Sequence, residues 1–460
     1  MRPLISCLMR VAILGTVLLT GCASLTRTPY HAPDVPLPAH YQHAQPAADS
    51  LRADAWWRAY GDPQLDAWVD LALARNPDLA AAAIRVRRAT LEARLAGNAL
   101  LPVINGSAGT GVSRPLSGSP RATTESGSGT LGASWELDLF DRLGAQRDAA
   151  VFEAQASAED RDAVALSLIG TTAGLYWQLG LANERIDLAE QSLAYARRTR
   201  ELVQAQYRSG AVSALEPREA EQSLAEQQAQ MTQLVQARID LRQALTVLFD
   251  GAAPPGNEPR ELPASVLPAI GAGLPAELLG RRPDLRAAEL RLRATLAASD
   301  AATTRYYPAL SLTGALGTSS RALLDVLANP VATLGANLTL PFLNVREMRL
   351  NTAIARTRHE EAVIVFRKSL YTALTDVEKA LSARTQLAEQ EAAQQRVRDE
   401  AVEIERLYEA RYRAGQVPVR AWLDAQERRR SAELAYVALH LARLQNHVVL
   451  IQALGGTASQ

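Results

Sequence analysis

This sequence has few cysteines, few aromatic residues and no excess of charge of either sign. Its two cysteines, Cys7 and Cys22, lie at the N-terminal end, so neither a disulfide framework nor a cysteine metal site can form further along the chain. The 49 basic residues balance the 49 acidic ones, which argues against nucleic acid as a partner. Aromatic residues make up 5% of the 460 residues and hydrophobic residues 48%, so the apolar content lies in Ala, Leu and Val. This composition suits long, closely packed helices.

Motifs for an enzyme are also missing. A G-x-x-x-x-G-K-[ST] phosphate loop cannot exist, because neither of the two lysines, Lys368 and Lys379, follows a glycine. There is no nucleophile elbow. His440 and His447 are seven residues apart, which is two helical turns and too far for one metal centre. We therefore expect no enzyme, no metal site and no cofactor.

The N-terminus has the layout of a secretory signal. Arg2 and Arg10 precede the apolar run Val11–Leu19, and Leu18–Cys22 resembles a bacterial lipobox. The lipobox implies removal of residues 1–21 and acylation of Cys22 with diacylglyceryl and N-acyl groups. No aspartate follows Cys22, which favours the outer membrane over retention at the inner membrane. Residues 22–62 are then an acylated tether and girdle segment.

Four landmarks recur in order at offsets of 203 to 206 residues, which indicates duplication of a whole module. The pairs are Asn76–Leu79 with Arg282–Leu285, Leu101–Pro102 with Tyr307–Pro308, Thr130–Ala133 with Thr333–Ala336, and Tyr207–Gly210 with Tyr412–Gly415. We expect a first repeat at 63–250, a Pro/Gly-rich linker at 251–275, a second repeat at 276–456 and a tail at 457–460.

Each repeat reads as helix, strand, strand, very long helix, turn and long helix. Residues 140–209 contain no proline and would span roughly 105 Å as one helix. A glycine follows, where a left-handed turn residue would reverse the chain. The second repeat has the same plan, with a helix from about 344 to 413, a break at 415–418 and a return through 454.

The short segments between the helices alternate with a period of two. They lie at about 103–113, 129–139, 309–319 and 332–340. Each is long enough for a tilted transmembrane strand, although a half-buried strand of a soluble sheet has the same pattern. After the signal there is no apolar run of about 18 residues, so we expect no helical span.

Four strands cannot close a membrane barrel, because open edges are excluded from lipid. Several chains must therefore contribute strands. Two copies would give eight strands and a filled interior, whereas three would give twelve and leave room for a lumen. We expect a homotrimer that forms a 12-stranded β-barrel continued by a 12-helix α-barrel.

The sequence also resembles a known family, the TolC-like outer-membrane factors. The resemblance rests on four segments, Trp56–Leu65, Asn76–Leu79, Tyr207–Gly210 and Tyr412–Gly415, and covers nearly the whole mature chain. The lipobox points to the acylated efflux lipoproteins of resistance-nodulation-division pumps. The resemblance implies a mainly helical protein with membrane β-strands in the outer membrane, which docks a periplasmic adaptor and an inner-membrane pump. It would passively export drugs or other toxic small molecules.

A duct that is open to the outside needs a closure, and charged residues near the two hairpin turns are candidates. Glu216 and Glu219 lie near the first turn, and Arg420 and Asp424 lie near the second. The resemblance implies that Asp424, nine residues after the second turn's glycine, forms an acidic ring at the closed end. Arg420 stands where many members of the family have leucine. We hypothesise that Arg420 pairs with Glu216 or with Asp424.

Residues at the two turns are candidates for contact with the adaptor. They are Tyr207, Arg208, Gly210, Tyr412, Arg413 and Gly415. For the tyrosines, packing in the core is an equally open interpretation. Trp56 and Trp57 are expected to fix the N-terminal segment to the girdle. Two other functions stay open: a duct for protein secretion of the type I kind, and a lipid-anchored periplasmic coiled-coil spacer.

Overall fold

The computed structural model describes residues 26–44, 55–117, 123–263, 267–320 and 330–456. The lipobox with Cys22 and the tail at 457–460 therefore lie outside the described residues. The chain divides into two compact units. Unit 1 comprises Met1–Val35, Ile84–Ala158 and Ala287–Lys368, and unit 2 comprises Pro36–Ala83, Glu159–Arg286 and Ser369–Gln460.

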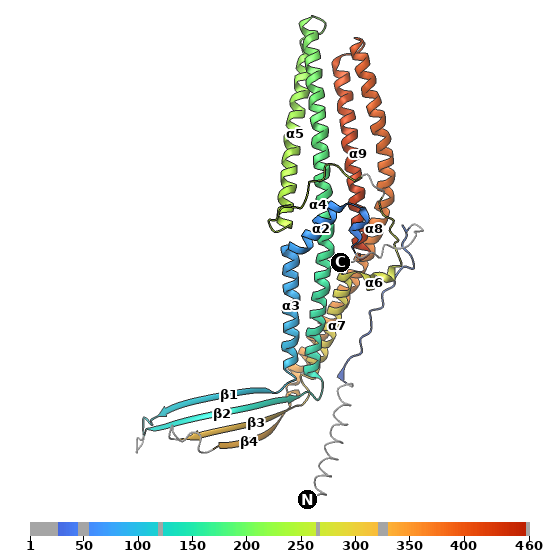
Figure 1. The fold of residues 1–460 in the computed structure, drawn as a ribbon. Helices are drawn as coiled ribbons and strands as arrows, with labels where there is room; N and C mark the ends of the chain where they lie inside the picture. Colours follow the sequence, from blue (N-terminus) through green and yellow to red (C-terminus); the bar gives the residue numbers. More distant parts are fainter. Residues whose placement is uncertain (1–25, 45–54, 118–122, 264–266, 321–329, 457–460) are drawn as a thin grey trace. The chain divides into compact units, whose positions relative to one another are not determined.

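The same series of elements occurs twice along the chain (Figure 1). The first half contains η1 (Trp56–Tyr60), α2 (Pro63–Arg75), α3 (Pro77–Asn98), β1 (Val103–Ser113), β2 (Thr124–Leu137), α4 (Arg142–Arg208) and α5 (Leu215–Leu248). The second contains η2 (Pro275–Glu277), α6 (Leu278–Arg281), α7 (Pro283–Thr304), β3 (Ala309–Ser320), β4 (Pro330–Thr339), η4 (Pro341–Leu343), α8 (Val345–Arg413) and α9 (Val419–Ala453). Helices α4 and α8 have 67 and 69 residues, and α5 and α9 have 34 and 35. The expected mainly helical fold with tandem repeats is confirmed.

The recurring Asn/Arg-Pro-Asp-Leu motif marks the start of the helix that leads to the sheet. Asn76 precedes α3, and its side-chain oxygen accepts hydrogen bonds from the N–H groups of Asp78 and Leu79. Proline at the first helical position costs nothing there, because its missing N–H would be unpaired anyway. The Asn76 amide also donates to the carbonyl of Leu248 at 3.0 Å, which fixes this start against the end of α5.

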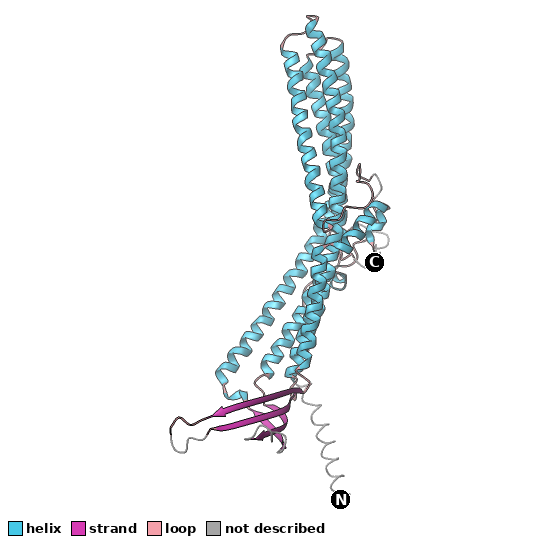
Figure 2. Ribbon diagram, turned by 60° about the vertical axis from the view of Figure 1, so that its left-hand side comes forward, coloured by secondary structure: helices cyan, strands magenta, loops and turns pink. Residues whose placement is uncertain are grey.

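The four strands form one antiparallel sheet in unit 1, in the order β1-β2-β3-β4 (Figure 2). Leu131 pairs with Leu316, and Trp135 pairs with Leu312, so apolar side chains of neighbouring strands share one face. Most of the Ser, Thr and Asn residues lie on the opposite face, together with Glu136 of β2. β2 begins at Thr124, earlier than the alternation predicts, because its first residues are Ser- and Gly-rich and show no apolar period.

Residues Thr26–Val35, here called the strap, are attached to unit 1 by polar contacts. Arg27 pairs with Asp141 and Asp148 at the start of α4. Further along the strap, the N–H and hydroxyl of Thr28 donate to Asp300 of α7 at 2.9 and 2.7 Å. The other strap contacts are Tyr30 with Glu289, the Arg293 guanidinium over the Tyr30 ring, and Arg367 with the carbonyl of Asp34.

Unit 2 contains two antiparallel helical hairpins that lie side by side, one from α4 and α5 and one from α8 and α9 (Figures 1 and 2). Near its middle, Trp56 and Trp57 of η1 are fully buried. Tyr60 packs edge-on against Trp177 of α4 and against His447 of α9. The aromatic residues of η1 thus join the two repeats.

The linker at 251–275 is attached to unit 2 mainly through its backbone. Polar side chains of the helices donate to its carbonyl oxygens. The pairs are Trp68 with Pro255, Asn183 with Pro259, His440 with Pro263, His447 with Pro268 and Arg384 with Ile270, at 2.8 to 3.2 Å. The two helical histidines that fit no metal site therefore hold the linker against α9.

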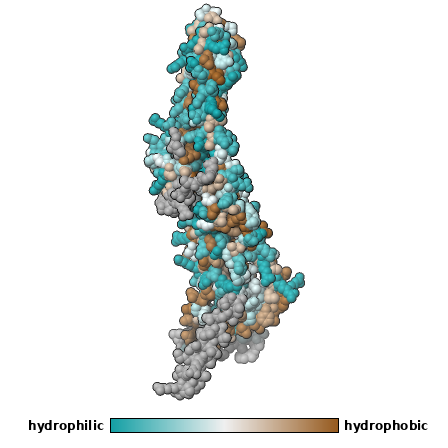
Figure 3. Space-filling model, turned by 90° about the vertical axis from the view of Figure 1, so that its right-hand side faces the viewer, coloured by the Kyte–Doolittle hydropathy of each residue, from teal (hydrophilic) through white to brown (hydrophobic). Residues whose placement is uncertain are grey.

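By length and composition alone, α4 and α9 are each apolar enough to cross a membrane. The mean hydropathy reaches 1.2 over 18 residues in each, but the core helix of a soluble protein meets the same criterion, so the absence of a helical span stays a prediction. In α4 the residues of that window are 61% buried, as in the core helix of a soluble protein. On the face drawn in Figure 3, hydrophilic side chains predominate over the hairpins, with hydrophobic ones between them.

Candidate gate at the hairpin turns

The two hairpins turn in the same way. Gly210 has a φ of +73°, and its N–H donates to the carbonyl of Tyr207 at 3.0 Å. Gly415 has a φ of +69°, and its N–H donates to Tyr412 at 2.9 Å. In both turns the next residue donates to the carbonyl five positions back, which completes a Schellman motif. Glycine adopts the left-handed conformation that this motif needs at the lowest cost.

An apolar cluster joins the hairpins just below these turns. Val203 and Ala220 come from the first hairpin, and Tyr412, Val419 and Trp422 come from the second. The rings of Tyr412 and Trp422 are stacked, with centroids 5.2 Å apart and planes inclined by 26°. This tip cluster holds the two hairpins together by buried apolar area and ring contact.

The residues expected at the tips fall into two groups. Tyr412 is 5% exposed and belongs to the tip cluster, whereas Tyr207 is 46% exposed. Burial, together with the nearby charge of Glu216, raises the pKa of Tyr412 to about 12. Arg208 and Arg413 are exposed. Of the side chains predicted at the tips, Tyr207, Arg208 and Arg413 can therefore be reached by another protein.

A buried carboxylate lies beside the tip cluster. Glu405 of α8 accepts hydrogen bonds from the Tyr195 hydroxyl at 2.8 Å and from Trp422 Nε1 at 3.0 Å. Glu409, one turn further along α8, lies 3.0 Å from the same hydroxyl. Burial and these two carboxylates raise the pKa of Tyr195. The hydroxyl therefore stays protonated and acts as the donor that joins α4 to α8.

Arg420 forms an ion pair, but not with either partner that we expected. Its Nη1 lies 3.5 Å from Oε1 of Glu219 on α5. Within the described part of the chain, Glu216 and Asp424 make no ion pair with Arg420, so the expected pairings are wrong. A base followed by an acid four residues later is the weaker orientation for a helical pair, and Glu219 approaches from the neighbouring hairpin. Asp424 is exposed on α9.

The sequence reasoning missed the buried acids of α8. Glu405 and Glu391 are 14 residues apart and share the seam that faces α9. Glu391 accepts from His440 Nδ1 at 2.7 Å and pairs with Arg443. The sequence does contain a signal for these acids, because both stand at the same seam position of α8. Their role can be recognised only in the structure, where Tyr195, Trp422 and His440 are seen to bind them.

The arrangement has no feature of a metal centre. Among the residues that the structure describes, no group of three or more His, Cys, Asp or Glu side chains could hold a metal ion. The region of the two turns instead offers long helices, an apolar cluster and charges that join neighbouring hairpins.

Comparison with known proteins agrees with this geometry. A family model described as outer membrane efflux protein matches residues 68–249 and 274–456. The chain is 32% identical to the pyoverdine export outer membrane protein OpmQ of Pseudomonas aeruginosa, over 97% of this chain and 96% of that protein. It is 29% identical to the toluene efflux pump outer membrane protein TtgC of Pseudomonas putida, over 99% of this chain and 96% of that protein.

A solved structure is similar over the same extent. The open state of the Neisseria gonorrhoeae MtrE outer membrane channel matches with a TM-score of 0.84 and 29% identity, over 94% of this chain and 98% of that one. Together with the match of both repeats to the family model, this likeness identifies the fold as TolC-like. The chain therefore belongs to the outer membrane efflux protein family and is an outer-membrane efflux channel.

Proposed function

We propose that this channel is the exit duct of a tripartite pump and works as a homotrimer. Twelve strands would form a barrel in the outer membrane, and twelve helices would continue it into the periplasm. The observation that carries the proposal is the sheet of unit 1, because it is amphipathic and has two open edges.

The edges of the sheet call for further chains. Within the described residues, β1 pairs only with β2, and β4 pairs only with β3. Unpaired backbone groups are not tolerated in the hydrocarbon region of a membrane, so both edges need partner strands there. If β1 of one copy pairs with β4 of the next, three copies close a barrel with a lumen.

The two faces of the sheet suit a barrel wall. Leu131, Leu316 and Leu334 on the apolar face are all exposed in the single chain, and Leu334 is 91% exposed. Contact with lipid would cover them. The Ser, Thr and Gly face would line an aqueous lumen, as in polar-lined membrane barrels.

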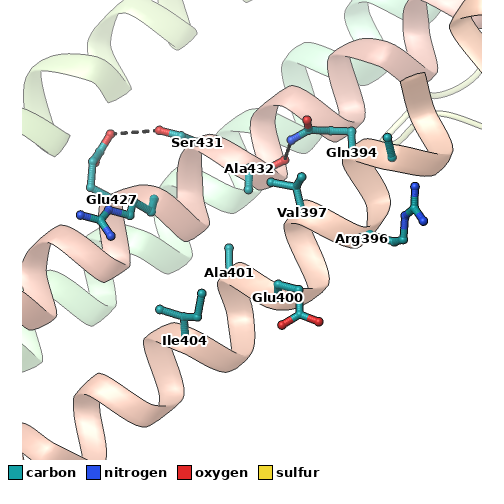
Figure 4. A pocket seen from close by; sticks show the side chains of 11 residues that line it. Gln394, Arg396, Val397, Glu400, Ala401, Ile404, Glu427, Ser431 and Ala432 are labelled. Atoms are coloured by element: carbon teal, nitrogen blue, oxygen red, sulfur yellow. Dashed lines mark hydrogen bonds between the residues drawn. The ribbon is translucent and has the colours of Figure 1, made fainter. Parts of the chain in front are cut away.

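The helices also leave apolar surface for a second copy of the chain. On α3, Ile84 and Leu91 are exposed at a seven-residue spacing. Between α8 and α9 a groove of about 860 Å³ has Val397, Ala401 and Ile404 along its α8 side (Figure 4). Helices of neighbouring copies packed at these seams would complete the α-barrel.

We infer that Cys22 carries the lipid anchor. The strap begins four residues later, and its contacts with α4 and α7 would hold the mature N-terminus close to the sheet. Acyl chains on Cys22 would add a membrane attachment that does not depend on the barrel.

We propose that the hairpin turns form the periplasmic gate. The Arg420–Glu219 ion pair and the tip cluster would hold the hairpins in the closed position, and Glu216 would add its charge beside Tyr412. Asp424 would repeat three times around the axis and attract cations.

The exposed tip residues would meet a periplasmic adaptor, which would connect the duct to an inner-membrane pump of the resistance-nodulation-division class. Tyr207, Arg208 and Arg413 are exposed at the turns. Two relatives are named for export of pyoverdine and of toluene, so we propose small organic molecules as cargo. The duct itself would be passive and would use no cofactor.

The decisive experiment is extraction of the protein from outer membranes in mild detergent, followed by mass measurement and planar-bilayer recording. A heat-sensitive trimer that forms channels supports the duct. A monomer without conductance would leave the lipid-anchored spacer. Deletion of the gene separates efflux from protein secretion: sensitivity to small toxic compounds supports efflux, and loss of one secreted protein without such sensitivity supports secretion.

A further inference from the structure

A cationic hollow lies in unit 1, outside the gate and the sheet. It has a volume of about 510 Å³ and is bounded by α4, α7 and α8. Small residues of α7, including Ala298 and Ala302, form one wall. Arg305, the residue after α7, and Arg358 of α8 also line it, and no acidic side chain of the described ranges does. Among the described residues, neither arginine forms an ion pair.

Helix geometry places the hollow on the side of α7 opposite to the strap. At about 100° per residue, Ala302 is about 200° away from Asp300, which binds Thr28 of the strap. Arg305 is about 140° away from Asp300 by the same rule. Ala298, Ala302 and Arg305 therefore face away from the residue that holds the strap, while Ser299 and Ala301, about 100° from Asp300, form the sides of the hollow.

The other two helices agree. On α4, Gln146 and Ala149 of the hollow are about 200° and 100° from Asp148, which pairs with Arg27 of the strap. On α8, Arg358 is about 180° from Arg367, which donates to the strap backbone. On each of the three helices α4, α7 and α8, the residues that contact the strap and the residues that line the hollow therefore lie on different sides of the helix.

The position of the strap shows which side of these helices forms the outer surface of the duct, and this step rests on the proposed function. An N-terminus acylated at Cys22 must reach lipid, so the strap has to run along the outer surface of the duct. The hollow then faces the lumen. In a trimer, three copies of Arg305 and Arg358 would place six guanidinium groups around the passage.

The chemistry of the hollow defines its ligand. Arginine guanidinium groups bind carboxylate and phosphate through paired hydrogen bonds, and they remain charged at every physiological pH. The alanine wall accepts an apolar body, and the Gln146 and Asn351 amides add neutral hydrogen-bonding groups. We propose that this hollow is a binding site in the lumen for amphiphilic organic anions. Arg305 and Arg358 would bind the carboxylate, sulfonate or phosphate group of the anion.

The test is block of single channels by benzene-1,3,5-tricarboxylate in planar bilayers. Arg305→Gln and Arg358→Gln are compared singly and together with the wild type. The matched control is Arg356→Gln, which removes one charge from the same helix at an exposed position that does not line the hollow. We expect the double variant to weaken block by about tenfold, which corresponds to about 1.4 kcal/mol, and the control to leave it unchanged. The single variants and Arg→Lys replacements, which keep the charge, should give smaller losses.

The outcomes are distinct. If the wild type forms no channels, the proposed function fails. If the wild type forms channels and block is equally strong in the wild type and in all variants, only the proposed anion-binding site is overturned. If block is unchanged and Arg305→Gln instead lowers the amount of phosphatidylglycerol retained by the purified trimer, the hollow faces lipid, and the lumenal proposal is also overturned.

Discussion

The hydroxyl of Tyr195 on α4 lies 2.8 Å from the buried carboxylate of Glu405 on α8, so a hydrogen bond joins the first helical hairpin to the second. Trp422 of α9 supplies the other donor to the same carboxylate. Glu405 is 6% exposed, so loss of a donor leaves a buried charge short of a partner, at a cost of about 1–3 kcal/mol.

We therefore expect Tyr195→Phe to weaken the packing of the two hairpins at the proposed gate. The trimer should dissociate at a lower temperature, and channels in planar bilayers should open more often. Tyr207→Phe is the matched control, because that tyrosine is exposed and outside the tip cluster. If the two variants open equally often, Glu405 takes no part in holding the proposed gate closed.

Arg420→Ala should raise single-channel conductance, because the Arg420–Glu219 ion pair joins α9 to α5 near the turns. The Arg420 side chain is 69% exposed, so the pair contributes at most about 1 kcal/mol and weakens with salt. Glu219→Ala should have the same effect, and the double variant should add little to it. An unchanged conductance in Arg420→Ala would contradict the proposal that the Arg420–Glu219 ion pair holds the gate closed.

His447 should make unit 2 sensitive to acid. Burial is the main cause that lowers its pKa below 6.5, while its neutral ring donates to Pro268 and accepts from Tyr60. The unfolded chain then binds a proton more readily, so stability is full above about pH 6.5 and falls as the pH drops below it.

His447→Gln should remove that sensitivity. We expect thermal unfolding at a lower temperature near neutral pH but a flatter decline between about pH 7 and 5. Circular dichroism over a pH series measures both effects. His31→Gln, at an exposed position of the strap, should retain the wild-type decline. A wild-type slope in His447→Gln would assign the acid sensitivity to other groups.

Adjacent residues of β4 should respond oppositely to charge. Leu334→Arg places a cation on the apolar face, where lipid would impose about 2–4 kcal/mol near the bilayer centre, so outer-membrane assembly should fall. Thr333→Arg projects from the polar face, so it should assemble and shift ion selectivity instead. Yield of heat-sensitive trimer and reversal potential distinguish the two. Equal assembly of both variants would refute a lipid-facing surface.

The repeat plan could be predicted because its signals are local. Gly210 and Gly415 mark the turns, and proline-free segments mark α4 and α8. Strand β2 begins earlier than the sequence predicts, because its first residues carry no apolar alternation. Local pattern is thus sufficient for elements whose periodicity is carried by large side chains.

The polar contacts could not be predicted because they depend on which helix faces which. Arg420 had acids within reach on two helices, and only the packing of α5 against α9 selects Glu219. Glu405 looked like one more surface acid until Tyr195 and Trp422 were in place around it. Likewise, only the packing shows that His440 and His447 each bind a carbonyl group of the linker, with Glu391 and Tyr60 as their respective second partners.

The attachment of the linker has an evolutionary consequence. Asn183 binds the carbonyl of Pro259, and His440 binds that of Pro263. Carbonyl oxygens are the same in every amino acid, so substitutions in the linker leave these bonds available. An inserted or deleted residue between 259 and 263 would move every later carbonyl out of register with its donor. This segment should therefore diverge freely in composition among descendants of the gene while keeping its length.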